Sequence, residues 1–391
     1  MEGDFIKIND WLLPLSWIYG AGVRLRNQMF EMGMLKSRSF DIPVISVGNI
    51  TVGGSGKTPH VEYLINLLRD KVKVAVLSRG YKRKSKGYML ATADTPMSDI
   101  GDEPYQMKKK FADIYVAVDK DRCHGIDQLT ANEETSDTDV ILLDDAYQHR
   151  YVKPGVNILL VDYHRLIMYD KLLPAGRLRE PQKGKARADI VIVSKCPAEL
   201  KPMEFRVITK AMNLFPYQKL YFTTLKYGSL RPIYGGEDRK LDKLTGDTSI
   251  LLLTGIASPQ QMIVDLKPYT ERITPLTFPD HHQYTDADID RINAEFEAMK
   301  GNDKMIVTTE KDNARLCGME GLSDEVKKNI YVLPVEVGFM LDQEEDFNEN
   351  IIGYVRKNSR NSILAKAKDD NKSDNSDNSG NRTRTISFRN N

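Results

Sequence analysis

The stretch Gly53-Gly54-Ser55-Gly56-Lys57-Thr58 follows an apolar run at residues 42–47 and opens a helical pattern that continues to Arg69. Glycines in such a loop let backbone N–H groups turn towards phosphate oxygens, and the helix N-terminus adds a positive dipole. The lysine would reach the β- and γ-phosphates of a nucleotide, and the threonine would bind Mg²⁺. The order of strand, loop and helix therefore predicts a nucleotide phosphate site formed by Thr51, Val52, Gly53, Gly54, Ser55, Gly56, Lys57 and Thr58. The strict form of the motif would have glycine at position 51.

Short apolar runs alternate with helical patterns on both sides of this loop. Near-continuous apolar runs are typical of strands buried on both faces of a parallel sheet. A first series covers residues 42–47, 72–77, 114–118, 140–144, 156–161 and 190–194, and a second covers residues 250–254, 273–278, 305–309 and 330–335. We predict an α/β chain with a P-loop NTPase-like, mostly parallel sheet flanked by helices, followed by a second, smaller α/β domain.

Four segments follow from this pattern. Residues 1–35 form an N-terminal membrane-interface helix, and residues 36–226 form the P-loop domain. A polar, turn-rich stretch at 227–247 begins the smaller domain, which we place at 227–357. Residues 369–384 contain no apolar side chain, so we predict a disordered tail over 358–391.

Composition excludes several classes of protein. The 391 residues carry 56 basic and 55 acidic side chains, so the whole chain offers no electrostatic basis for binding nucleic acid. Three scattered cysteines without a CxxC pair exclude a disulfide framework, and no cluster has the ligand spacing of a zinc site. The sequence gives no sign of an obligate protein partner.

The N-terminal helix is apolar but short. Residues 11–23 carry no charge, whereas a spanning helix needs about 18 to 20 such residues. At helical spacing one face gathers Trp11, Leu15, Ile18, Leu25, Met29 and Met32. This face either packs on the domain or lies in a membrane interface. Both tryptophans of the chain occur here, at positions 11 and 17, which favours the membrane.

The run Val140-Ile-Leu-Leu-Asp144-Asp145 is an apolar strand that ends in two acids, where nucleotide enzymes hold their metal. Together with Lys57 and Thr58 it predicts a Mg²⁺-nucleotide enzyme or switch. Gln148 and His149 follow at once, so their side chains should emerge at the carboxyl edge of the sheet, where ligands of α/β proteins bind.

Further motifs resemble those of a known family, and this resemblance indicates the phosphoryl acceptor. They are Gly48-Asn49, Ser78-Arg79-Gly80-Tyr81, Gly101-Asp102-Glu103-Pro104, Asp144-Asp145-Ala-Tyr-Gln148-His149-Arg150, Leu173-Pro-Ala-Gly176 with Leu178-Arg179-Glu180, Phe278-Pro-Asp280-His281-His282 and Thr309-Glu310-Lys311-Asp312. In this order they closely resemble the tetraacyldisaccharide 4'-kinase family, the lipid A kinases of Gram-negative bacteria. The resemblance runs to about residue 335. Threonine at position 51 belongs to the family's own loop, whereas Ala146 and Tyr147 replace the commoner glycine and leucine.

The resemblance implies ATP and Mg²⁺ as cofactors and a lipid disaccharide 1-phosphate as substrate. It implies transfer of the γ-phosphoryl group to the sugar 4'-hydroxyl by a peripheral protein at the cytoplasmic face of the bacterial inner membrane. The second domain would close over the nucleotide.

Roles for individual residues follow in part from this resemblance. Lys57 would act in catalysis, and Asp102 would accept the proton of the sugar hydroxyl with His281 orienting it. The metal would be held by Thr58, Glu103, Asp144 and Asp145. The side chains implied for substrate binding are Arg79, Tyr81, Arg122, Gln148, His149 and Arg179.

Two other functions fit part of the pattern. A P-loop nucleotide switch at the membrane would hydrolyse ATP slowly and would need no sugar acceptor. It would not need Asp102 and His281 as an acid–base pair. A kinase of a soluble sugar would have no use for the apolar N-terminal helix.

Overall fold

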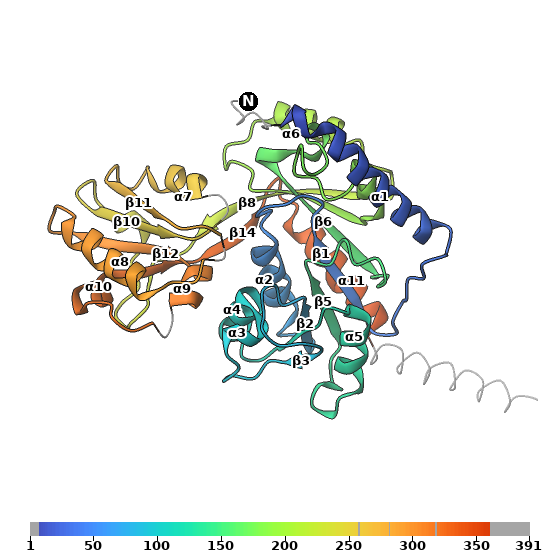
Figure 1. Ribbon diagram of the computed structural model, residues 1–391, viewed down its shortest axis with the longest axis horizontal. Coiled ribbons are helices and arrows are strands. Elements are labelled where there is room, and N and C mark those ends of the chain that lie inside the picture. Colours follow the sequence, from blue (N-terminus) through green and yellow to red (C-terminus); the bar gives the residue numbers. More distant parts are fainter. Residues whose placement is uncertain (1–7, 257–258, 281, 317–318, 360–391) are drawn as a thin grey trace, which may run out of the picture.

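The computed structural model describes residues 8–256, 259–280, 282–316 and 319–359, which form two lobes, each built around its own β-sheet (Figure 1). The N-terminal helix α1 (Leu13–Glu31) lies along the outside of the larger lobe. His281, Cys317 and the predicted tail from residue 360 lie outside the described residues.

The larger sheet has nine strands in the order β14-β8-β7-β6-β1-β5-β2-β4-β3. Neighbouring strands are parallel except at the two edges, where β3 pairs with β4 and β14 pairs with β8 in antiparallel orientation. The strands are β1 Val44–Gly48, β2 Val74–Ser78, β3 Met89–Leu90, β4 Tyr115–Val118, β5 Val140–Asp144, β6 Val156–Asp162, β7 Ile190–Ser194, β8 Lys219–Tyr227 and β14 Val335–Phe339.

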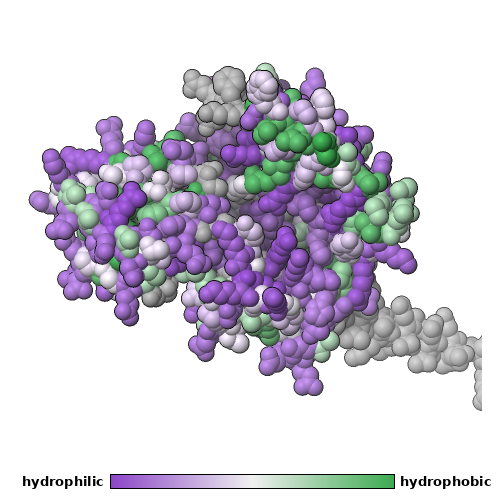
Figure 2. Space-filling view, in the orientation of Figure 1, coloured by the Kyte–Doolittle hydropathy of each residue, from purple (hydrophilic) through white to green (hydrophobic). Residues whose placement is uncertain are grey.

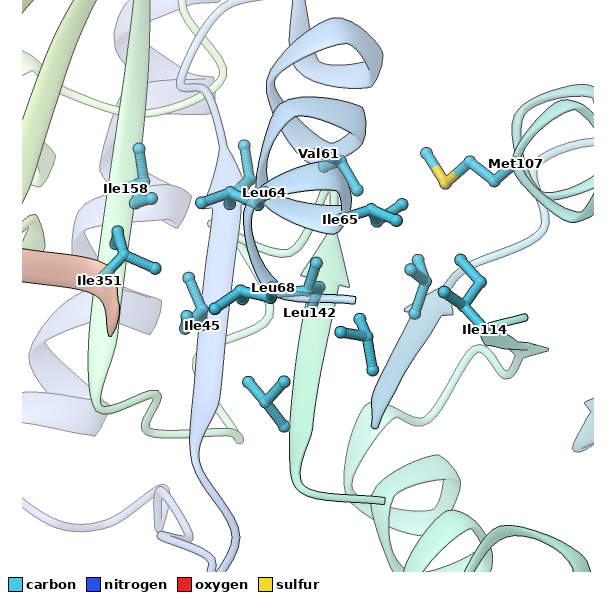
Figure 3. Packing of buried hydrophobic residues seen from close by; sticks show 14 of the residues in the cluster. Ile45, Val61, Leu64, Ile65, Leu68, Met107, Ile114, Leu142, Ile158 and Ile351 are labelled. Atoms are coloured by element: carbon cyan, nitrogen blue, oxygen red, sulfur yellow. The ribbon is translucent and has the colours of Figure 1, made fainter. Parts of the chain in front are cut away.

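Helices cover both faces of this sheet. They are α2 Lys57–Leu68, α3 Met97–Ile100, α4 Asp102–Lys110, α5 Arg122–Ala131, α6 Pro202–Met212 and α11 Glu344–Asn358, with short 3₁₀ turns at Asp10–Leu12, Glu133–Thr135, Tyr163–Arg165, Ile167–Tyr169 and Gln182–Arg187. Helix α2 places Leu64, Ile65 and Leu68 against the strands, and Ile351 of α11 joins the same cluster (Figure 3). Each such fully buried aliphatic side chain contributes about 1.5–3 kcal/mol. This packing holds the loop between β1 and α2 in place.

The smaller lobe repeats the plan on five strands in the order β11-β10-β12-β13-β9. Its strands are β9 Arg231–Pro232, β10 Ser249–Thr254, β11 Ile273–Thr277, β12 Lys304–Thr309 and β13 Ile330–Leu333, and its helices are α7 Pro259–Leu266, α8 Asp286–Ala298, α9 Glu310–Leu316 and α10 Asp324–Asn329, with a 3₁₀ turn at Leu241–Lys243. The predicted fold class, two α/β units with mostly parallel sheets, is confirmed.

The predicted C-terminal limit of the smaller domain, residue 357, is wrong. Pro334 divides the predicted strand 330–335, and the chain beyond it returns to the larger sheet as β14. Helix α11 then buries Phe347, Ile351 and Val355 in the cluster that contains Ile45 of β1. The smaller lobe therefore ends near residue 334.

Helix α1 presents its apolar residues outward. Trp11 of the preceding turn is 93% exposed, and Trp17 and Ile18 are 68% and 71% exposed. The residues that this helix buries against the protein are Ser16, Gly20 and Phe30. Ser16 Oγ donates to the Leu172 carbonyl, and a Cβ on Gly20 would lie 2.7 Å from Leu172 Cδ1. Figure 2 shows the apolar residues gathered on the surface over α1. No helix among the described residues is long and apolar enough to cross a bilayer.

Candidate active site

The phosphate-binding loop lies between β1 and α2. Gly53 and Gly56 have φ angles of 119° and 79°, in the left-handed region that favours glycine. Asn49 Nδ2 donates to Ser55 Oγ over 2.8 Å, and Ser194 Oγ donates to the Ser55 carbonyl over 2.9 Å. Since Ser55 is only 1% exposed, these bonds brace the loop from inside. The loop is thus shaped for an anion at the amino end of α2.

Gly48 brings this loop against the segment that follows β5. A Cβ atom at position 48 would lie 2.7 Å from Tyr147 Cβ and 2.8 Å from the Tyr147 backbone nitrogen. In the parallel pairing of β1 with β5, Val47 is level with Asp144. The phosphate loop and the two acids therefore share one edge of the sheet.

Asp144 is completely buried at the end of β5. Ser78 Oγ donates to its Oδ2 over 3.4 Å, while its Oδ1 has no hydrogen-bond partner within the described part of the chain. Burial, reinforced by the charges of Glu103 and Asp145, raises the pKa of Asp144 to about 7. A buried carboxylate oxygen without a donor is the kind of ligand that a hard divalent cation accepts.

Asp145 points towards basic groups instead. Its Oδ1 lies 3.6 Å from Lys57 Nζ and its Oδ2 lies 3.6 Å from Arg179 Nη1. Burial alone would raise the pKa of Asp145, but the charges of Lys57 and Arg179 outweigh burial and lower it. Asp145 therefore carries a negative charge beside the phosphate loop.

Two cavities meet at the phosphate loop. The larger cleft, of about 1010 Å³, is lined by eight basic and four acidic side chains, with Tyr19, Val23 and Arg26 of α1 forming one wall. The smaller cavity, of about 240 Å³, continues past the loop between the two lobes. Both cavities are lined by Gly54, Lys57, Glu103, Asp280 and Lys311.

The smaller cavity combines an apolar wall with polar groups. Leu225 and Tyr227 come from β8 and Val335 from the neighbouring edge strand β14, and Met262 comes from α7. Gln106, Gln261 and several charged side chains add polar groups to the lining, which suits a flat aromatic base next to the phosphate site. These residues were missed because no local motif marks them.

Most of the predicted substrate residues line the larger cleft. Arg79, Tyr81, Gln148 and Arg179 lie there. Gln148 is held by its side chain, which donates from Nε2 to the Asn49 carbonyl over 2.6 Å.

Arg122 and His149 lie elsewhere. Arg122 is 2% exposed and donates to the carbonyls of Asp119, Lys120 and Asp144 at 3.3–3.4 Å, so it supports the loops instead of facing the cleft. Burial, followed by the charge of Arg122, lowers the pKa of His149 to about 4. The ring of His149 lines a separate cavity of about 310 Å³. The predicted substrate contacts of these two residues are therefore not supported.

Asp102 is the first residue of α4 and is held from the other lobe. Arg315 donates to Asp102 Oδ2 from Nε over 2.9 Å and from Nη2 over 2.5 Å. The same guanidinium donates from Nη1 to Asp312 Oδ1 and to the Gly255 carbonyl. His281, the predicted partner of Asp102, lies outside the described residues.

The basic residue Lys311 was quoted in a motif but received no role from the sequence. Its Nζ lies 3.2 Å from Asp280 Oδ1 and 3.9 Å from Glu103 Oε1, at the junction of the two cavities. A second, half-buried interlobe contact is formed by Lys110, whose Nζ bridges Glu62 and Glu310, each over 2.7 Å.

Comparison with known proteins agrees with this geometry. The profile of the family described as tetraacyldisaccharide-1-P 4'-kinase matches residues 8–356. The chain belongs to this family. It is 61% identical to the tetraacyldisaccharide 4'-kinase of Phocaeicola vulgatus over 93% of its own length and 99% of the relative. It is 54% identical to the enzyme of Bacteroides thetaiotaomicron over 93% and 98%.

A solved structure also matches. The crystal structure of LpxK from Aquifex aeolicus in complex with ATP superposes with a TM-score of 0.67 at 32% identity, covering 88% of this chain and 98% of the other. As a member of the tetraacyldisaccharide 4'-kinase family, the chain is a kinase of lipid A biosynthesis. The predicted activity is confirmed, and the alternative of a nucleotide switch is set aside.

Proposed function

We propose that this kinase moves the γ-phosphoryl group of ATP across the boundary between the two cavities, from a nucleotide in the smaller cavity to a lipid disaccharide 1-phosphate in the larger cleft. The observation that carries the proposal is that both cavities are lined by Gly54 and Lys57 of the phosphate loop. A donor and an acceptor bound on opposite sides of this loop would meet at Lys57, whose charge would stabilise the transferring group.

Mg²⁺ fits the residues present. Thr58 offers a hydroxyl oxygen, Asp144 offers a buried oxygen without a donor, and Asp145 and Glu103 add carboxylates close by. Hard oxygen ligands of this kind suit Mg²⁺. When bound with ATP, the ion would neutralise charge on the β- and γ-phosphates. Asp144 would hold it, and Asp145 would keep Lys57 in place.

The larger cleft suits an anionic sugar lipid. Arg79, Arg177, Arg179 and Lys311 converge on it, and arginine grips phosphate oxygens in pairs. The 1-phosphate of the acceptor supplies such a group. Tyr81 and Gln148 offer hydrogen bonds to the sugar hydroxyls.

Asp102 remains our candidate for the base. It lies beside Glu103, and Arg315 fixes its carboxylate with two bonds to one oxygen. A carboxylate held in this way can accept the proton of the 4'-hydroxyl as the new P–O bond forms.

Helix α1 supports a peripheral position at the cytoplasmic face of the inner membrane, where a lipid acceptor resides. Its outward face carries Trp17 and Ile18, while Tyr19 and Arg26 of the same helix line the larger cleft. An interfacial helix would therefore place the cleft at the membrane surface. A further cavity of about 760 Å³ between α1 and residues 170–187, with Leu13, Trp17 and Leu172 in its lining, could take acyl chains.

Transfer of labelled phosphate tests the function directly. The enzyme is incubated with ATP, Mg²⁺ and either detergent-dispersed tetraacyl disaccharide monophosphate or a water-soluble disaccharide. Labelled product is expected from the lipid only. Equal labelling of the soluble sugar would contradict the proposed role of the lipid-facing surface.

Flotation with anionic vesicles tests the helix. Ile18→Glu places a charge on the apolar face of α1, whereas Val264→Glu places one on α7 of the smaller lobe at a similar exposure of 57%. Only the first variant should lose vesicle binding and show a raised KM for the lipid. Equal flotation of both variants would show that α1 does not anchor the protein.

A further inference from the structure

A cluster of metal-ligating side chains lies outside the cavities used by the kinase reaction. One ligand atom each from Asp121, Cys123 and His149 lies within 4.8 Å of the other two. The three residues come from the start of α5 and from the loop after β5, two places that are not neighbours in sequence. Spacing along the chain therefore does not reveal the cluster.

The fold fixes the first two members. Asp121 is the N-cap of α5, and its Oδ1 accepts from the backbone N–H of Cys123 over 3.0 Å and of His124 over 3.3 Å. This cap holds the carboxylate beside the Cys123 side chain and leaves Oδ2 out of the capping bonds.

The third member, His149, lies in a well-packed turn after β5. The His149 backbone N–H donates to the Ala146 carbonyl over 2.8 Å, and the Val152 N–H donates to the His149 carbonyl over 3.3 Å. Ala146 and Val152 belong to the same buried cluster as Ile126 of α5. This cluster brings the turn to the amino end of α5, where a ring nitrogen of His149 lies within 4.8 Å of Cys123 Sγ.

The imidazole is ready to bind a cation. Its Nε2 is buried and has no hydrogen-bond partner within the described residues. An imidazole binds a metal ion through a ring nitrogen that carries no proton. A buried ring nitrogen without a partner is unfavourable unless a ligand reaches it.

The donor set selects the kind of ion. Nitrogen, sulfur and oxygen donors together suit zinc and similar transition metals, and not Mg²⁺. On a tetrahedral zinc ion such donors lie roughly 3.3–3.6 Å apart, given bonds of about 2.0–2.3 Å. Closing the cluster from separations of up to 4.8 Å needs at most about 1.5 Å of side-chain movement.

Charges around the cluster are compatible with a divalent ion. Cysteine binds a metal ion as the thiolate, so the Cys123 thiol would release its proton on binding the metal. The resulting thiolate and the Asp121 carboxylate balance the two charges of the ion. Arginines also act on the cluster. Arg38, beside Cys123, is engaged by Asp127 through two bonds of 2.6 and 2.7 Å. Arg122, beside His149, donates to the carbonyls of Asp119, Lys120 and Asp144.

We propose that Asp121, Cys123 and His149 form a three-ligand site for a divalent transition-metal ion such as Zn²⁺, with water completing its coordination. His149 directly follows Gln148, which lines the larger cleft. An ion at this site would tie α5 to the loop that carries Asp145 and Gln148, and so would stiffen one wall of the cleft.

Co²⁺ absorption tests the site, because a cobalt–thiolate bond gives a charge-transfer band in the near ultraviolet. Tag-free, metal-stripped protein is titrated with Co²⁺ in excess Mg²⁺, which occupies the oxygen-ligand site. One Co²⁺ per chain with this band is expected, and Zn²⁺ should displace it. Absence of the band in the unaltered protein would overturn the proposal.

Variants identify the ligands. Cys123→Ser should lose the band and weaken Co²⁺ binding by more than about tenfold. Loss of a residue that only hydrogen-bonds a metal ligand already lowers metal affinity by about tenfold or more, and loss of a ligand should cost more. Its kinase activity without added transition metal should be unchanged. Cys196→Ser, at a buried thiol whose Sγ contacts the Val193 carbonyl, is the matched control and should keep the band.

A second variant protects the test against a folding defect. Asp121→Asn retains a good helix cap but removes the anionic ligand, so Co²⁺ should bind more weakly while the thermal unfolding midpoint stays the same. A band that persists unchanged in Cys123→Ser, or Co²⁺ binding that Asp121→Asn leaves intact, would refute the assignment.

Discussion

The raised pKa of Asp144 predicts that this kinase binds Mg²⁺ more weakly as the pH falls below neutrality. Burial and the neighbouring Glu103 and Asp145 carboxylates raise this pKa to about 7. A protonated carboxyl group cannot hold the metal, so proton and Mg²⁺ compete for Asp144. At pH 6 about one chain in ten has an ionised Asp144, and at pH 8 about nine in ten do. The apparent affinity for Mg²⁺ should therefore fall about tenfold between pH 8 and pH 6.

The assay is a Mg²⁺ titration of the steady-state rate at saturating ATP and lipid, repeated at pH 6, 7 and 8. ATP also titrates in this range, so Asp144→Asn serves as the matched control. The variant should need more Mg²⁺ at every pH, and its pH dependence should be only that of ATP. If the two proteins show the same change with pH, Asp144 does not hold the metal or does not titrate near 7.

The same shift has a consequence for stability in the absence of metal. A carboxyl group in the unfolded chain ionises near pH 3.9, so between about pH 4 and 7 the native protein holds a proton that the unfolded chain lacks. The free energy of unfolding should fall as pH rises through this window, by at most about 1.4 kcal/mol for each pH unit. Urea titrations in EDTA should show this slope for the unaltered protein and a smaller one for Asp144→Asn.

Three further predictions concern the loop, the core and the base. Lys57→Ala should lower kcat by roughly 10²–10³-fold with unchanged circular dichroism, because it removes the charge beside the transferring group; a loss below tenfold in the transfer assay would contradict this role. Phe347→Ala should lower the free energy of unfolding by about 3–5 kcal/mol in urea titrations, since the ring is 1% exposed in the larger core, whereas the exposed Glu349→Ala on the same helix should change it little. Asp102→Ala and His281→Ala should each reduce kcat greatly with little change in ATP affinity, and the double variant should be scarcely worse; kcat losses that simply multiply would show independent action.

Much of the fold was predictable because parallel strands that are buried on both faces appear in the sequence as continuous apolar runs. Strand β8 was missed because Lys219–Tyr227 mixes polar and apolar residues, and only the middle of the strand is buried. The return of Val335 to the larger sheet could not be read from the chain either. Hydrophobicity tells which residues are buried and not which sheet they join.

The site shows the same division. The phosphate loop and Asp144 lie in local motifs. The residues they contact belong to the same motif or to the adjacent strand, so the sequence was enough to predict them. The bond from Arg315 to Asp102 joins residues 213 positions apart across two lobes. Arg122 and His149 sit in motif-like positions, but the packing of α5 turns both away from the cleft. Motifs identify the chemistry, whereas tertiary packing decides which members face the substrate.

The pairing of β8 with β14 means that the smaller lobe is an insertion in a β-hairpin. Tyr227 lies opposite Val335, and the Gly228 N–H donates to the Pro334 carbonyl over 3.0 Å, so the chain leaves the larger sheet and re-enters it at adjacent points. A tight two-residue turn could join these two strands directly, as is feasible for inserted domains whose ends lie close together. Such a shortened chain would keep the phosphate loop and α11 but lose Lys311 and Arg315. It would show whether the larger lobe alone binds a nucleotide, without the smaller lobe to cover the site. In the whole chain these two roles belong to lobes that are joined only through β8 and β14.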